Sequence, residues 1–171
     1  MLDAAGRYEE TATAAQDAMR VAQQAGLLAQ EIRAGFVHAS ALVGRGAFAG
    51  SEAAVRRYVD RAMTAGLQGV AADGLIDLAG TLQVRNRLEE AEASLVRATG
   101  IAQERSLMRT AMRAATQRAS LAQQGNRPRE ALTLLEEPLK YFAESRYRRL
   151  EAVAMAWSGS GRALTRRFVS R

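Results

Sequence analysis

Residues 86–91 read NRLEEA, and three more segments align with them at intervals of 40 residues. Residues 6–11 read GRYEET, residues 46–51 read GAFAGS and residues 126–131 read NRPREA. No gap is needed to align the four. A fixed period of this size is typical of a solenoid, in which similar helical units stack and bury one another's apolar faces. We therefore predict a repeat array with an extended surface suited to recognition.

Each period contains two amphipathic segments, one on either side of the aligned motif. Ile32, Phe36 and Ala39 precede a motif, while Leu95 and Ala98 follow one, at the spacing of a single helical face. Each motif begins with Gly or Asn, which tolerate the left-handed backbone that ends a helix. Each period is therefore predicted to be a helix–turn–helix hairpin. The predicted turns are at Gly6, Gly46, Asn86 and Asn126.

Eight helices are expected from this pattern. Their predicted ranges are 7–26, 28–44, 50–66, 68–84, 88–105, 107–124, 128–145 and 148–168. Pro138 falls inside a predicted helix, where proline removes a hydrogen bond and costs about 3 kcal/mol, so we expect a kink or an early end there. In the last helix Gly159 and Gly161 each cost about 1 kcal/mol relative to alanine. Because Arg162 replaces an apolar residue there, that helix is expected to be an irregular polar cap.

The repeat resembles the tetratricopeptide repeat (TPR) in its 40-residue form, which occurs in kinesin light chains, bacterial Rap-type regulators and large LuxR-type activators. The small residues that match this family are Ala39, Ala79, Ala119 and Gly159 in first helices, and Thr11, Ser51, Ala91 and Ala131 in second helices. The resemblance covers nearly the whole chain and implies an all-α, right-handed α-solenoid of antiparallel helix hairpins. It implies a single domain, with a half unit at 1–27, repeats at 28–67, 68–107 and 108–147, and a terminal capping helix at 148–171.

Composition excludes several kinds of chemistry. The chain has no cysteine and one histidine, His38, so disulfides, thiolate metal sites and histidine clusters are absent. Nucleophilic triads and zinc hydrolysis therefore have almost no candidates, and we predict no enzyme activity, no cofactor and no metal site. His38 is interpreted as a structural residue, and the sole tryptophan, Trp157, as a core anchor. The lack of a signal-peptide pattern and of a long apolar run favours a cytoplasmic location.

The TPR resemblance implies that the first helices of the hairpins line a concave face that binds a ligand. The corresponding positions are Arg33, Phe36, Ser40, Asp73, Ile76, Asp77, Arg113, Thr116, Gln117 and Ser120. Arg33 and Arg113 could each pair with a carboxylate or phosphate of that ligand. The alternative is that these are ordinary solvated residues. We expect a protein–protein interaction module that binds a peptide or protein segment. The excess of arginine (23) over lysine (one) suggests a GC-rich bacterial genome and says nothing of function. We expect the module to be part of a bacterial regulatory or scaffold protein.

The uneven charge of the chain leaves a second function open. The formal net charge is +6, and residues 121–171 carry 10 basic and 5 acidic side chains. A basic C-terminal half could bind nucleic acid through phosphate contacts. The arginines concerned are Arg109, Arg113, Arg146, Arg148, Arg149, Arg166 and Arg167. Few aromatic residues accompany them, which makes this the less favoured alternative. The first and last helices could also pair in self-association, and no membrane binding is expected.

Overall fold

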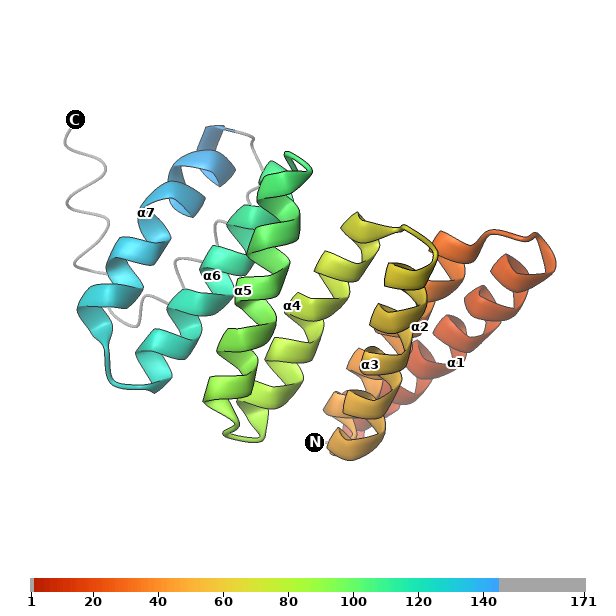
Figure 1. Cartoon of the computed structure of the whole chain (residues 1–171). Coiled ribbons are helices and arrows are strands. Elements are labelled where there is room, and N and C mark those ends of the chain that lie inside the picture. The colour runs from red at the N-terminus through yellow and green to blue at the C-terminus, as the bar shows by residue number, and fades with distance from the viewer. Residues whose placement is uncertain (1, 145–171) are drawn as a thin grey trace.

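The computed structural model describes residues 2–144, and the side chains of residues 6–143. Within these residues the chain forms seven α-helices joined by short turns, with α1 at one end of the array and α7 at the other (Figure 1). The helices are α1 (Leu2–Gln24), α2 (Leu28–Gly44), α3 (Phe48–Thr64), α4 (Gln68–Val84), α5 (Leu88–Glu104), α6 (Met108–Gln124) and α7 (Pro128–Glu144).

Six of the helices agree with the sequence prediction to within two residues at each end. The exception is α1, which begins at Leu2 and passes through Gly6. The predicted turn at Gly6 was therefore wrong, because at the other motifs a Gly or Asn closes a preceding helix, whereas Gly6 lies within the helix itself. The predicted helix at 148–168 lies outside the described residues, as do Trp157, Gly159, Gly161 and Arg162.

The prediction for Pro138 is corrected in one respect. An early end of the helix is not observed, because α7 continues past Pro138 to Glu144. The proline ring is fully buried. Burial of an apolar side chain of this size contributes about 1.5–3 kcal/mol, which is comparable to the cost of the missing hydrogen bond.

All six turns are built in the same way and recur every 20 residues. The middle residue of each has a positive φ angle: Gly26 (69°), Gly46 (78°), Gly66 (71°), Asn86 (58°), Ser106 (55°) and Asn126 (57°). In the first turn the N–H of Leu27 donates to the carbonyl of Ala22 at 2.8 Å, and the equivalent bond closes each of the other five. This is the Schellman motif, which satisfies carbonyls at the end of a helix. The true turn period is thus half the sequence period.

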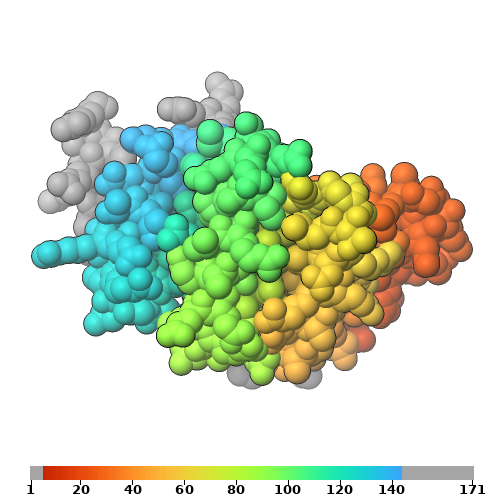
Figure 2. Space-filling view, in the orientation of Figure 1, coloured from red at the N-terminus to blue at the C-terminus, as the bar shows by residue number. Residues whose placement is uncertain are grey.

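The helices form two rows. The inner row contains α2, α4 and α6, which contact one another as well as their neighbours in the chain. The outer row contains α1, α3, α5 and α7, and its members make at most slight contact with one another. Closer packing along one side places the inner row on the inside of the curve. The hairpins follow one another along the molecule in chain order (Figure 2).

Small residues at the repeated positions allow the rows to pack closely. Ala39 and Ala79 are completely buried, and Ala119 is 2% exposed. One continuous apolar core extends from α1 to α6, and a second cluster joins α6 to α7. Among the described residues, no helix is long and apolar enough to cross a membrane.

Candidate ligand-binding groove

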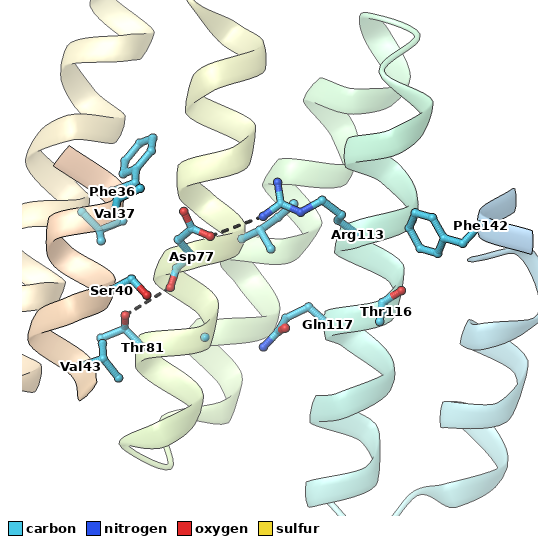
Figure 3. A pocket seen from close by; sticks show the side chains of 13 residues that line it. Phe36, Val37, Ser40, Val43, Asp77, Thr81, Arg113, Thr116, Gln117 and Phe142 are labelled. Carbon is cyan, nitrogen blue, oxygen red and sulfur yellow. Dashed lines mark hydrogen bonds and ion pairs between the residues drawn. The ribbon is translucent and has the colours of Figure 1, made fainter. Parts of the chain in front are cut away.

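A groove of about 510 Å³ lies along the inner row, with contributions from α3 and α7 (Figure 3). Seven of the ten predicted ligand positions line it: Phe36, Ser40, Ile76, Asp77, Arg113, Thr116 and Gln117. The remaining lining residues are Val37, Val43, Val55, Gly80, Thr81 and Phe142. Most of these lie at helical spacing from a predicted position and could have been included on that basis. Val55 and Phe142 could not, because they reach the groove from the outer-row helices α3 and α7.

The floor of the groove belongs to the protein core. Phe36 is 5% exposed and Ile76 is 6% exposed. The ring of Phe36 packs edge-on against Tyr58, with ring centroids 6.1 Å apart, and lies so close to Gly74 that a Cβ there would be 2.3 Å from Cζ of the ring. Phe36 therefore offers a ligand little surface. Val37, next in the chain and 49% exposed, supplies the apolar surface at the rim.

Three charged side chains form a ladder across the inner row. Arg33, Asp73 and Arg113 occupy the same position in successive repeats, one on each inner helix. Arg33 Nη1 lies 3.2 Å from Asp73 Oδ2, and Arg113 Nη1 lies 2.7 Å from Asp73 Oδ1. Thr110 also donates to Asp73, at 3.3 Å. Both arginines that were predicted to bind a ligand anion are thus already paired within the chain.

Asp77 is the other carboxylate of this face. Its Oδ1 lies 3.6 Å from Arg113 Nη2, and 38% of its side-chain surface is exposed. Figure 3 shows the two side chains directed toward each other between α4 and α6. Burial raises the pKa of Asp77 to about 6. Arg113 lowers this pKa, while Asp73 raises it further. The groove therefore contains a carboxylate whose charge is incompletely balanced.

The remaining polar positions are held by hydrogen bonds. Gln117 donates to Gln83 at 2.7 Å, and Gln83 donates to Ser120 at 2.6 Å. Ser120 is buried between helices, and with Arg33 and Asp73 it is one of the three predicted positions that do not line the groove. His38 is half-buried, with Nε2 3.2 Å from Gln16 Nε2 on α1. Within the described part of the chain, no group of three or more His, Asp or Glu side chains lies close enough together to hold a metal ion.

Two comparisons with known proteins find no match: no protein-family model matches the chain, and no curated protein matches it. Solved structures do match. A crystal structure of TPR-like repeats, of the kinesin light chain type from Podosopora anserina, superimposes with a TM-score of 0.56. The sequences are 14% identical, and the match covers 98% of this chain and 90% of that one. The chain therefore has the TPR-like fold, an all-α solenoid of helix hairpins.

Proposed function

We propose that this chain is a protein–protein interaction module that binds a peptide or a segment of another protein in the groove of the inner row. One observation carries the proposal. Seven positions selected from the sequence as ligand contacts line a single groove that combines apolar and polar side chains. A groove of this kind on a helical array suits an extended or helical segment of a partner. The TPR-like fold supports the same function.

Two details of the proposal rest on sequence alone. The preference for arginine over lysine agrees with a bacterial source, and we propose that the module belongs to a regulatory or scaffold protein that acts in the cytoplasm. No catalytic constellation was found in the sequence, so we propose binding without chemistry.

A matched pair of substitutions tests the groove. Val37 lines the groove and is 49% exposed, whereas Val96 lies on the outer helix α5 and is 54% exposed. Random dodecamer peptides on phage would be selected against the full chain, and their dissociation constants measured by fluorescence anisotropy. Val37→Gln is expected to weaken binding about tenfold, since the ligand then meets an amide in place of an apolar side chain. Val96→Gln should bind as the wild type does.

Two results would overturn the proposal: failure to select any peptide, or equal affinity of the wild type and the Val37→Gln variant. Phe36→Ala is unsuitable for this test. Because Phe36 is part of the core, its truncation would cost about 3–5 kcal/mol of stability and would confuse unfolding with loss of binding.

A second candidate function, nucleic-acid binding, is favoured by where the charge lies. Residues 145–171 contain seven arginines and one glutamate, and hence the whole net charge of +6, while residues 1–144 are neutral. Phosphate-driven binding weakens steeply as salt increases. Retention of a single-stranded oligonucleotide by the full chain should therefore fall between 50 and about 200 mM salt. It should also fall when Arg146, Arg148 and Arg149 are replaced by glutamine. Salt-independent retention would exclude this function.

A further inference from the structure

We infer that the segment bound in the groove presents a lysine or arginine side chain to the carboxylate of Asp77, next to an aliphatic side chain that packs against Val37. This inference rests on the proposed function. It specifies the chemistry of the ligand, which the proposed function leaves open.

The first argument concerns the charges that are already matched. Arg33 and Arg113 both contact Asp73, which lies between them. An anionic group of a ligand that approached either arginine would have to compete with Asp73 at hydrogen-bonding distance and would be repelled by it. The ladder therefore disfavours an acidic ligand.

The second argument concerns the Asp77 carboxylate, which is only partly matched by Arg113. The nearest cationic nitrogen to Asp77 is Arg113 Nη2 at 3.6 Å, which is too far for a hydrogen bond. Among residues 6–143 no side chain contributes a hydrogen bond to this carboxylate. An ionised carboxylate only accepts hydrogen bonds, at about four lone-pair sites. A ligand ammonium or guanidinium supplies both the donors and the missing charge. The raised pKa of Asp77 agrees with this deficit.

The third argument concerns the neighbours of Asp77. Val37, Asp77 and Gln117 occupy the same position in three successive repeats, so they form a row across α2, α4 and α6, and all three line the groove. From α2 to α6 the side chains of this row are apolar (Val37), acidic (Asp77) and amide (Gln117). Lysine and arginine carry apolar stems that pack on side chains such as valine while the charged end reaches a polar partner. A basic residue beside an aliphatic one fits this row.

The test uses the dodecamer peptides selected on the full chain. Lysine or arginine should be enriched at one position next to an aliphatic residue. Asp77→Asn should weaken such a peptide about tenfold or more, because a charge-assisted pair is lost. Replacing the basic residue of the peptide by norleucine should weaken wild-type binding by the same factor, with little further loss on Asp77→Asn. Asp17→Asn removes an equal charge from α1, outside the groove, and should change nothing.

Three further measurements keep the outcomes separate. Asp77→Glu retains the charge and should retain the preference, while Asp77→Lys should shift selection toward Asp and Glu. Circular dichroism would verify that each variant is folded. If peptides depend on Val37 but show no basic preference and bind Asp77→Asn normally, this inference is wrong and the proposed function stands. If no selected peptide depends on Val37, both are wrong.

Discussion

Two clusters of arginines and carboxylates on this molecule contain the same kinds of side chain, but the pKa of a carboxyl group is lowered in one and raised in the other. One is the inner-row set of Arg33, Asp73, Asp77 and Arg113, of which Asp77 and Arg113 line the groove. The other, which we call the edge cluster, joins the start of α3 to the turn between α4 and α5. Its members are Glu52, Arg56, Arg85, Arg87 and Glu90.

In the edge cluster three arginines donate hydrogen bonds to one carboxylate, that of Glu52. Arg87 Nη1 lies 2.9 and 2.7 Å from the two carboxylate oxygens of Glu52, and Arg56 and Arg85 donate to the same carboxylate. Desolvation raises the pKa of Glu52, but hydrogen bonds from Arg56 and Arg87 outweigh it, so that this pKa lies below its usual value. The pKa of Asp77 is raised instead. Internal pairing is complete at the edge and incomplete in the groove, as expected of a structural clamp and a binding surface.

The largest effect should come from the edge. Glu52→Gln keeps the size of the side chain but removes the charge that three arginines share. Hydrogen bonds to charged groups contribute about 1.5–3 kcal/mol, so we expect a loss of about 2 kcal/mol in the free energy of unfolding. Urea unfolding followed by circular dichroism would measure this.

Glu136→Gln is the matched control for that substitution. Glu136 is exposed on α7, so its change should stay within about 0.5 kcal/mol. Equal effects of the two substitutions would show that the edge cluster is not a clamp, and the contrast with the groove would be lost.

Asp77 should have the opposite dependence on pH, and its effect is reduced by solvent because its side chain is 38% exposed. The folded-state pKa of about 6 exceeds the ordinary value of 3.8, so the folded chain binds the proton more tightly than the unfolded chain does. The wild type should therefore gain stability as the pH falls from about 7 to 4. Glu52, with its lowered pKa, stabilises above pH 4.5 and loses that contribution below it. The groups that face Asp77 are Asp73 on its own helix and Arg113 on α6.

Asp77→Asn should remove the decline in melting temperature between pH 5 and 7, and Glu52→Gln should reduce the decline below pH 4.5. Melting temperatures measured by circular dichroism from pH 3.5 to 8 would separate the decline between pH 5 and 7 from the decline below pH 4.5. If Asp77→Asn leaves the decline between pH 5 and 7 unchanged, the charge of the Asp77 carboxylate is already balanced in the free protein. The inference of a basic ligand then loses its support.

The sequence predicted the array well because its signals are local. A Gly or Asn that tolerates a positive φ angle, and apolar residues at helical spacing, act within one hairpin, so α2 to α7 were placed to within two residues. The turn predicted at Gly6 was wrong because glycine forms a turn only where a helix ends, and α1 continues through Gly6. The groove positions followed from the repeat register, since equivalent residues of successive helices must lie side by side.

Pairing between side chains could not be predicted in the same way. Glu52 meets Arg85 and Arg87 only after α4 has reversed the direction of the chain. Glu92, the equivalent residue one repeat later, pairs with Arg118 instead, so the register alone does not give the partner. The charge of Arg33 and Arg113 suggested an anionic ligand; the repeat register already placed Asp73 between them, but only the structure gives the distances that show them to be paired. Tyr58 occupies the position that Ala18 and Ala98 hold in the neighbouring repeats, and it fits because Gly35 leaves room for its ring. Each of these contacts joins side chains of different helices, and its distance can be obtained only from the structure.

The smallest effect should come from the end of the ladder. Arg33 is 54% exposed and makes one contact with Asp73, which keeps Arg113 and Thr110 when Arg33 is removed. Exposed ion pairs contribute about 0–1 kcal/mol, so Arg33→Gln should lower the free energy of unfolding by less than about 0.5 kcal/mol. The same urea experiment measures it. A loss as large as that of Glu52→Gln would mean that the ladder is a second clamp. The groove would then differ from the edge only at Asp77, and the carboxylate alone would have to account for recognition.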